Sequence, residues 1–432
     1  MRLISTFFCK IYDNKKALAT SIVLGSILCS AVFLIFLKNI GPVEHKVPGT
    51  DYFDRYEPIA NNILHGKGVM YRGEVLAYTA PGFPIILAGI FGLSQITGID
   101  RLDLVVVFNI IFTAFSALFL FLAAGKIFNK KVALIASLLW MTYPLNLWFL
   151  KNPNTEVPFI LLLFIGIFFY FSSLQKGPAC RQAGSPKIIF LAGLFLGLAS
   201  FARITGLFLP LSLGLLSLLF LSGSRKKRFL LAAILLMGNL VAIFPWMVYS
   251  LSKTGSFISI SREGPYSIVA GITWLSTVKA GGVQLVLPDD VSALIERVKI
   301  ADLSSGAKLG QFFGKELIDR PVAFLKLIGL KLARSWYATS QQWWEDKILL
   351  VQSIYLITGI GGIIYGMRIY KDRIKSIILL LSIIFYFWAM TFVNISLLRY
   401  LMPAMGLVII FSAVFIDYAI FHLNNNSLQK RR

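Results

Sequence analysis

Three carboxylates lie within seven positions of one another, shortly after the first apolar run of the chain. In the stretch VPGTDYFDRYEPIANNILHGKG, residues 47–68, they are Asp51, Asp54 and Glu57. A carboxylate can take a proton from a reacting hydroxyl group, so the cluster is a candidate for general-base chemistry. The alternative is that Asp51 and Asp54 are helix caps or first-turn acids, which the helix dipole stabilises.

One further acid and two arginines lie at the ends of apolar runs. Glu156, in NPNTEVPF, is either another first-turn acid or a functional group, because carboxylates at membrane depth are rare and usually face a cavity or a partner. Arg203, in SFARITGLFLP, and Arg399, in SLLRYLMPAM, either extend to lipid head groups or bind a phosphate. A guanidinium matches phosphate oxygens with two parallel hydrogen bonds.

Two more cations, Lys331 and Arg334, lie in LIGLKLARSWYATSQQWWE on an expected interfacial helix. The aromatic residues that follow them are Trp336, Tyr337, Trp343 and Trp344. We interpret these as a belt at the level of the lipid head groups, where Trp and Tyr are enriched. A platform that stacks against a sugar is the alternative.

The composition indicates a membrane protein. Of the 432 residues, 57% are hydrophobic, whereas soluble domains are about 45–50% apolar. The net charge of +22 does not indicate a nucleic-acid partner, because its distribution follows membrane topology. The three cysteines and three histidines match neither a disulfide framework nor a zinc site. We predict no dedicated metal cluster and leave a divalent metal open as a cofactor.

Ten uncharged runs bounded by charge predict an all-α polytopic membrane protein. They are 17–37, 104–125, 132–150, 157–175, 188–202, 204–224, 229–252, 348–367, 376–398 and 400–416. The first run is long enough to span and shows no clear cleavage site, so we do not expect a cleaved signal. Residues 75–99 carry Pro81 and Pro84, which favours an interfacial or shallow re-entrant helix over an eleventh span.

The charge distribution predicts the orientation. With ten spans, one side holds both termini, the short loops and 21 of the 42 Lys and Arg, but only three of the 20 acids. Short loops rich in Lys and Arg stay cytoplasmic, so we expect both termini in the cytoplasm and residues 38–103, 151–156 and 253–347 outside. The expected regions are 1–37 (tail and first span), 38–103 (first outer loop), 104–252 (six-span core), 253–347 (second outer loop) and 348–432 (three spans and tail).

Several stretches, in this order, resemble one family of membrane enzymes. They are YEPIANNILHGKGV, YTAPGFPIILAGIF, AAGKIFNKKVALIASLLWMTYP, TEVPF, LAGLFLGLASFARITGLFLPL, PWMVYSLSKTGSFISIS and LLRYLMPAM. Together they cover nearly the whole chain and resemble the GT-C superfamily of integral-membrane glycosyltransferases, in the bacterial branch of protein O-mannosyltransferases and lipid A aminoarabinose transferases. The resemblance implies transfer of a sugar from a polyprenyl-phosphate carrier, on the outer side of the cytoplasmic membrane, to a lipid, glycan or protein acceptor.

The resemblance also implies roles for particular residues. Asp51 matches the catalytic Asp of the family's first loop and Glu156 the acid of its Thr-Glu motif. Many relatives have an Asp-Glu pair where Tyr52 follows Asp51 here, so Asp54 and Glu57 are the alternatives for an acceptor-binding or metal-binding acid. Arg203 and Arg399 match basic positions associated with the carrier phosphate, and Lys331 and Arg334 are further candidates for that phosphate.

Two other classes of protein stay open at this stage. A transporter or flippase of lipid-linked envelope precursors is expected to have paired half-helices and charges at mid-membrane, whereas the ionisable residues here lie at the ends of the runs. A non-catalytic scaffold, or a polysaccharide polymerase or ligase without the first-loop acid, is the third possibility. Replacement of Asp51 discriminates between an enzyme and a scaffold.

Overall fold

The computed structural model describes residues 14–40, 51–71, 74–75, 79–174, 185–220, 223–262, 264–276, 285–340, 342 and 344–429. The α-helices in these residues are α2 (Lys15–Ile40), α3 (Glu57–Leu64), α4 (Gly82–Thr97), α5 (Arg101–Ile127), α6 (Lys130–Met141), α7 (Pro144–Leu147), α8 (Glu156–Leu174), α9 (Pro186–Ala202), α10 (Leu209–Phe220), α11 (Arg225–Thr254), α12 (Gly264–Thr273), α13 (Asp289–Ile300), α14 (Gly306–Asp319), α15 (Pro321–Arg334), α16 (Glu345–Ile369), α17 (Ile374–Val393) and α18 (Leu398–Gln429). The other elements are a π-helical turn η1 (Tyr52–Tyr56), the 3-10 turns η2 (Trp148–Lys151), η3 (Ile204–Gly206), η4 (Trp274–Ser276) and η5 (Lys371–Arg373), and two short antiparallel strands, β1 (Met70–Tyr71) and β2 (Glu74–Val75).

The described residues contain seven helices long and apolar enough to cross a membrane, namely α2, α5, α8, α11, α16, α17 and α18. The all-α membrane class is therefore confirmed, but the count of ten spans is not. The expected span 132–150 is bent by 49° between α6 and the α7–η2 segment, and it makes an eighth span only if the two parts count as one. The bend precedes Pro144, whose ring forces Tyr143 into an extended conformation. The expected spans 188–202 and 204–224 are short helices, α9 and α10.

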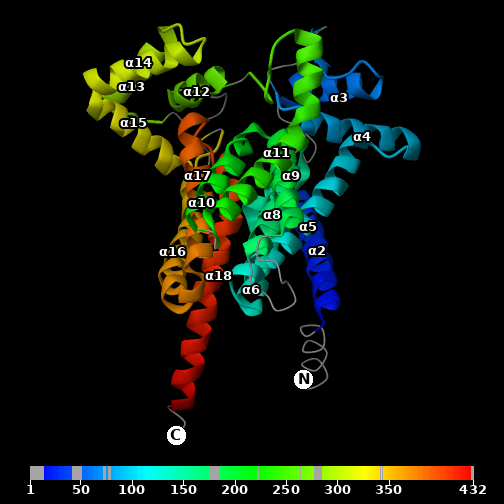
Figure 1. The fold of residues 1–432 in the computed structure, drawn as a ribbon, viewed down its shortest axis with the longest axis vertical. Helices are drawn as coiled ribbons and strands as arrows, with labels where there is room; N and C mark the ends of the chain where they lie inside the picture. The colour runs from blue at the N-terminus through cyan, green and yellow to red at the C-terminus, as the bar shows by residue number, and fades with distance from the viewer. Residues whose placement is uncertain are drawn as a thin grey trace.

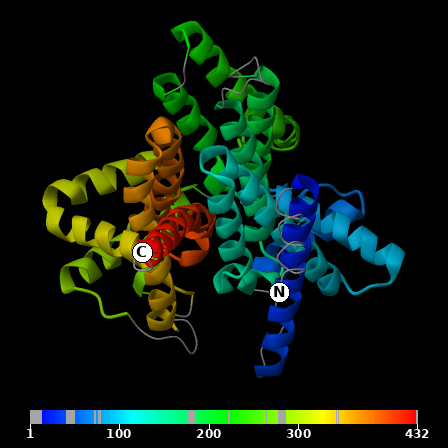
Figure 2. The ribbon, with the colours of Figure 1, turned by 90° about the horizontal axis from the view of Figure 1, so that it is seen from below.

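The main core of the bundle lies between α5, α6, α8, α9, α17 and α18. Close packing of the helices relies on small residues, as is common in membrane bundles. At Gly193 on α9, an added Cβ would lie 1.9 Å from the carbonyl oxygen of Leu235 on α11. Only glycine therefore permits this approach. Seen along the bundle, α16, α17 and α18 lie side by side, and α2 lies on the opposite side of the molecule (Figure 2).

The two long segments between spans lie at one end of the bundle (Figure 1). The start of α2 and the end of α18 lie at the other end, so the molecule is asymmetric. On one side, η1, α3 and α4 share a small core that includes Tyr52, Ala60 and Phe83. On the other side, α12 to α15 have a core of their own, including Val291 and Leu327.

Helix α4 lies across the end of the bundle beside α3 and at an angle to α5 (Figure 1). It is one of the shorter apolar helices and is not among the seven candidate spans. The preceding helix, α3, buries Ile59 and Ala60, as its apolar spacing predicts. It ends before Gly66, whose φ of +73° is a conformation that glycine adopts without strain.

Candidate active site

Glu156 is buried at the start of α8, with 5% of its side chain exposed. The helix is capped by Asn154, whose Oδ1 accepts a hydrogen bond from the N–H of Val157 at 3.0 Å. Oε1 of Glu156 lies 2.6 Å from Nη1 of Arg203. The Thr155 hydroxyl accepts from that same Nη1 and donates to Oε2 of Glu156, each at 3.2 Å. Glu156 is therefore a first-turn acid of α8, as one of its two interpretations predicts, and its charge is compensated by a cation, as a buried carboxylate requires.

Arg203 lies at the break between α9 and η3, with an extended backbone. Its side chain is 8% exposed, so its guanidinium faces the protein interior. The guanidinium lies over the ring of Tyr400, 4.5 Å from the ring centre. Helix α4 packs tightly beside this break, because a Cβ at Gly82 would lie 2.6 Å from the carbonyl oxygen of Phe201.

Arg399, the second residue of α18, lies between two acids. Its Nε is 3.5 Å from Oε1 of Glu156, and its Nη2 is 3.8 Å from Oδ2 of Asp51. Its side chain is 40% exposed, so part of the guanidinium is open. Neither Arg399 Nε nor Glu156 Oε1 makes a directed hydrogen bond within the described part of the chain, although both lie close to opposite charges. Nη2 of Arg399 donates to the hydroxyl of Tyr400 at 3.4 Å. Because 40% of the side chain is exposed, the guanidinium can still meet a further anion.

Asp51 directly precedes the π-helical turn η1. Its backbone is already helical, and its side chain makes no capping hydrogen bond. The side chain is half exposed and is directed toward Arg399 rather than toward the helix amides. Turns of π-helix are frequent at functional sites. We name Asp51, Glu156, Arg203 and Arg399 together the acid–arginine cluster.

Tyr56 lies within the electrostatic field of this cluster. Burial raises the pKa of its phenol, and the negative charge of Asp51 raises that pKa further. The phenol therefore stays neutral and can donate a hydrogen bond near Asp51. Its ring packs edge-on against Phe83 of α4, with 5.1 Å between ring centres. The first loop and α4 together hold this side of the site.

The other two acids of the first loop have different surroundings. Asp54 is exposed on η1. Burial raises the pKa of the Tyr52 phenol, and the negative charge of Glu57, the first residue of α3, raises that pKa further. The structure thus brings Asp51 alone of the three acids into contact with Arg399.

Lys331 and Arg334 are both buried on α15, but they contact other groups. Nζ of Lys331 donates to the carbonyl oxygens of Gly271 at 2.7 Å and of Asn394 at 2.9 Å. Arg334 pairs with Glu345, with 2.9 Å between Nη2 and Oε1. The structure therefore does not bring these two cations into the acid–arginine cluster.

Lys331 is nevertheless connected to the cluster through the backbone. It holds Asn394, where the segment leading to α18 begins. At the other end of that segment, the N–H of Leu398 donates to the carbonyl of Ala338 at 3.0 Å. Arg399 follows directly. The end of α15 and the turn after it therefore fix the segment that presents Arg399.

Burial lowers the pKa of Lys331 to about 7. Between pH 7 and the ordinary lysine value of 10.5, the unfolded chain binds a proton that the folded chain does not, so the free energy of unfolding rises with pH. We expect the thermal midpoint of the purified protein to rise more between pH 7 and pH 9 than that of Lys331→Met. Lys326→Met, which removes an exposed lysine paired with Asp290, is the control and should keep the wild-type slope. Equal slopes for wild type and Lys331→Met would contradict this expectation.

The expected aromatic belt is partly inside the protein. Trp336 packs against Trp388 of α17, with 6.0 Å between ring centres. Trp344 is 61% exposed, and Nζ of Lys347 lies 3.6 Å from its ring centre. Trp343 lies outside the described residues. Of the two tryptophans that the structure describes, Trp344 therefore has the surroundings expected at a head-group boundary.

Sequence analysis did not identify Tyr56, Tyr400 and Thr155 as site residues. Tyr56 has the spacing of an apolar helix face, and Tyr400 the position of an interfacial aromatic. The one sequence feature that marks Tyr400 and Thr155 is their position next to candidate residues, since Tyr400 follows Arg399 and Thr155 precedes Glu156. Within the described residues, no group of three or more His, Cys, Asp or Glu side chains is placed to hold a metal ion.

A protein-family model described as dolichyl-phosphate-mannose-protein mannosyltransferase matches residues 80–249 of this chain. The match includes Glu156 and Arg203 and excludes Asp51 and Arg399. A search of curated proteins finds no match.

Solved structures match over almost the whole chain. The oligosaccharyltransferase of Archaeoglobus fulgidus in its apo form aligns with a TM-score of 0.58 and 14% identity, covering 96% of this chain and 52% of that one. ArnT from Cupriavidus metallidurans, bound to undecaprenyl phosphate, aligns with a TM-score of 0.50 and 12% identity. The alignment covers 94% of this chain and 61% of that one. This chain has the fold of the GT-C superfamily. The GT-C resemblance drawn from the sequence is thus confirmed at the level of fold.

A further structure of the archaeal enzyme, AglB from Archaeoglobus fulgidus in complex with an inhibitory peptide and a dolichol-phosphate, aligns equally well. Its TM-score is 0.58 at 14% identity, and the alignment covers 96% of this chain and 52% of that one. The present chain spans about half the length of that oligosaccharyltransferase.

Proposed function

We propose that this chain is a glycosyltransferase that moves a sugar from a polyprenyl-phosphate carrier to an acceptor hydroxyl group. The observation that carries the proposal is the acid–arginine cluster, in which four charged side chains from distant parts of the sequence meet at one end of the bundle. Two arginines beside a half-exposed carboxylate suit a reaction that needs a base and releases a phosphate. The bound dolichol-phosphate of AglB and undecaprenyl phosphate of ArnT support a donor of this class.

The proposed step uses Asp51 as the base. Asp51 takes the proton from the acceptor hydroxyl, whose oxygen then forms a bond to the anomeric carbon of the sugar. The bond between that carbon and the phosphate oxygen breaks, and both of its electrons leave with polyprenyl phosphate. Arg399, with its open donors, stabilises the negative charge that develops on the leaving group.

Glu156 has a positioning part in this scheme. It is buried and lies close to both guanidinium groups, so it holds them at one place while Asp51 stays free to meet the acceptor. Asp54 and Glu57 are candidates for contact with an acceptor or metal, and Asp54 is the more open of the two. The donor is proposed to carry a hexosyl or pentosyl group, and the acceptor to be a lipid, a glycan or a protein.

A transporter is not favoured by the arrangement of charge. The cluster consists of residues at helix ends, namely the starts of η1, α8 and α18 and the end of α9. Transporter sites are instead built near the midplane from broken helices in repeated halves.

We place the cluster on the outer side of the cytoplasmic membrane, with both termini inside. A reporter fused after Arg228 should therefore read cytoplasmic, and one inserted after Ser304, between α13 and α14, should read external. The physical reason is the concentration of Lys and Arg without acids in the short loops. Protease accessibility of the same tags in sealed vesicles is the measurement. An external signal at Arg228 would reverse the orientation and place the cluster in the cytoplasm.

The function is tested most directly by product analysis. Mass spectrometry of envelope lipids and glycans should show one sugar modification lost in cells without this chain and restored by the wild-type gene. Membranes with the protein should release polyprenyl phosphate from the matching sugar-linked carrier when acceptor is added. If no modification changes while a lipid-linked precursor accumulates on one side of the membrane, a flippase would be the better description.

A further inference from the structure

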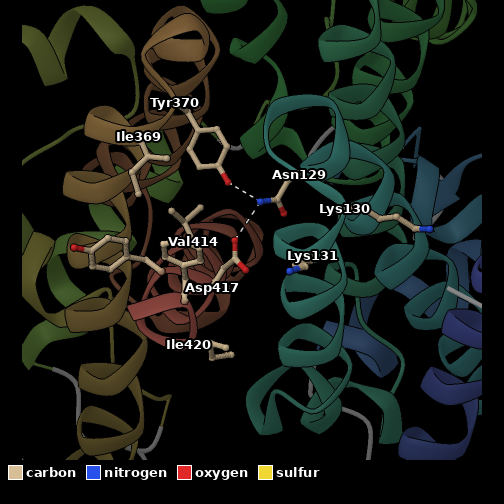
Figure 3. A pocket seen from close by; sticks show the side chains of 10 residues that line it. Asn129, Lys130, Lys131, Ile369, Tyr370, Val414, Asp417 and Ile420 are labelled. Carbon is tan, nitrogen blue, oxygen red and sulfur yellow. Dashed lines mark hydrogen bonds between the residues drawn. The ribbon is translucent and has the colours of Figure 1, made fainter. Parts of the chain in front are cut away.

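A second site lies at the opposite end of the bundle from the acid–arginine cluster. A cavity of about 750 Å³ opens between the start of α6, the end of α16 and residues 414–421 of α18 (Figure 3). Arg399 and Asp417 are 18 positions apart on α18, which corresponds to about 27 Å along the helix. The cavity is therefore not part of the proposed active site.

The cavity is lined by two lysines, Lys130 and Lys131, and by one acid, Asp417. Lys131 and Asp417 both line it, and neither has an ion pair within the described part of the chain. Figure 3 shows Lys131 pointing toward the Asp417 side of the cavity, whereas Lys130 points away. Asp417 is held in place by Asn129, whose amide donates to Oδ2 at 3.1 Å and to the hydroxyl of Tyr370 at 2.8 Å.

The walls of the cavity are apolar and uncovered. Ile369, Ile420 and Phe421 are 52%, 49% and 61% exposed. The candidate span α16 ends here at Ile369, and the uncharged run 400–416 of α18 ends just before Asp417. Side chains at the end of a span lie at the depth of lipid head groups, with acyl chains beside the apolar residues above them.

We propose that this cavity binds a phospholipid whose head group carries both a phosphate and a primary ammonium. The phosphate lies at Lys131, the ammonium lies at Asp417, and the acyl chains lie against the apolar wall. Charge complementarity selects a head group with two opposite charges, because an anionic head group alone would leave Asp417 without a cation. The volume is in the range of about 300–1,000 Å³ that ligand sites usually have.

The test is lipid binding by the full-length protein purified in detergent, measured by native mass spectrometry with dioleoyl phosphatidylethanolamine or phosphatidylglycerol. The wild-type protein should retain more phosphatidylethanolamine than phosphatidylglycerol. Asp417→Asn should lower its binding about ten-fold and abolish the preference, because a charge-assisted contact is lost. Lys131→Met should weaken both lipids, and Asp417→Glu should keep the preference. Lys371→Met, an exposed lysine at the same end but outside the cavity, is the matched control and should match wild type.

Three results would overturn the proposal. One is equal or better retention of phosphatidylglycerol by wild type, and another is an unchanged preference in folded Asp417→Asn. The third is displacement of the lipid by soluble glycerophosphoethanolamine at equal concentration, which would indicate a water-soluble zwitterion instead. Gel filtration of each variant identifies any variant that fails to fold. If Asp417→Asn does not fold, the lipid binding of Asp417→Glu and Lys131→Met decides whether the proposal holds. Because these residues lie far from Arg399, the outcome is independent of the proposed glycosyl transfer.

Discussion

Asp51→Asn is expected to lower the turnover of sugar transfer about 10²- to 10⁴-fold, the usual contribution of a general base. The amide has the same shape but cannot accept the proton of the acceptor hydroxyl. Because Asp51 is half exposed and its nearest ionic contact is Arg399 at 3.8 Å, the substitution should leave folding intact. The measurement is the rate of polyprenyl-phosphate release from membranes with matched amounts of protein, together with the thermal midpoint.

Asp54→Asn is the matched control, since it removes a carboxylate from the same turn that is exposed and makes no contact with Arg399. It should keep nearly full activity, and Glu57→Gln should lose far less than Asp51→Asn. Full activity of Asp51→Asn together with an inactive Asp54→Asn or Glu57→Gln would move the catalytic role to one of those acids. If all three variants are fully active, the glycosyltransferase proposal itself fails.

Arg399→Ala is expected to weaken use of the donor about 10- to 100-fold at subsaturating concentrations, which corresponds to one lost charge-assisted contact of about 1.5–3 kcal/mol. The guanidinium is partly open, so the loss should appear in kcat/KM for the donor while the thermal midpoint changes little. Arg399→Lys should restore activity only in part, because an ammonium cannot form two parallel hydrogen bonds to a phosphate. Unchanged donor use by the alanine variant would show that Arg399 contacts only its neighbours.

Arg203 provides the contrasting case. Its side chain is buried, and its removal leaves the equally buried Glu156 with Arg399 alone, at 3.5 Å. Breaking a buried ion pair destabilises by about 3–5 kcal/mol, so Arg203→Ala should lower the thermal midpoint as well as the activity. A double variant that also carries Glu156→Gln should recover part of the stability but not the activity. Equal stability of the two single arginine variants would contradict the different burial of the two side chains.

The sequence by itself determined the membrane class and the positions of the apolar helices, and its eight candidate residues included the four members of the acid–arginine cluster. Uncharged runs of about 20 residues have few alternatives to a buried or spanning helix. A lone charge at the end of such a run is costly unless it has a partner, which is why Glu156, Arg203 and Arg399 were recognisable as candidates.

Only the tertiary structure decided which of the charged residues meet. Lys331 and Arg334 are cations in the same kind of sequence neighbourhood as Arg399, but α15 directs Lys331 toward backbone carbonyls and Arg334 toward Glu345. Asp51, Asp54 and Glu57 are close in sequence, yet the π-helical turn directs Asp51 alone toward Arg399. Contacts between residues hundreds of positions apart depend on how the helices pack, and local spacing carries no information about that packing.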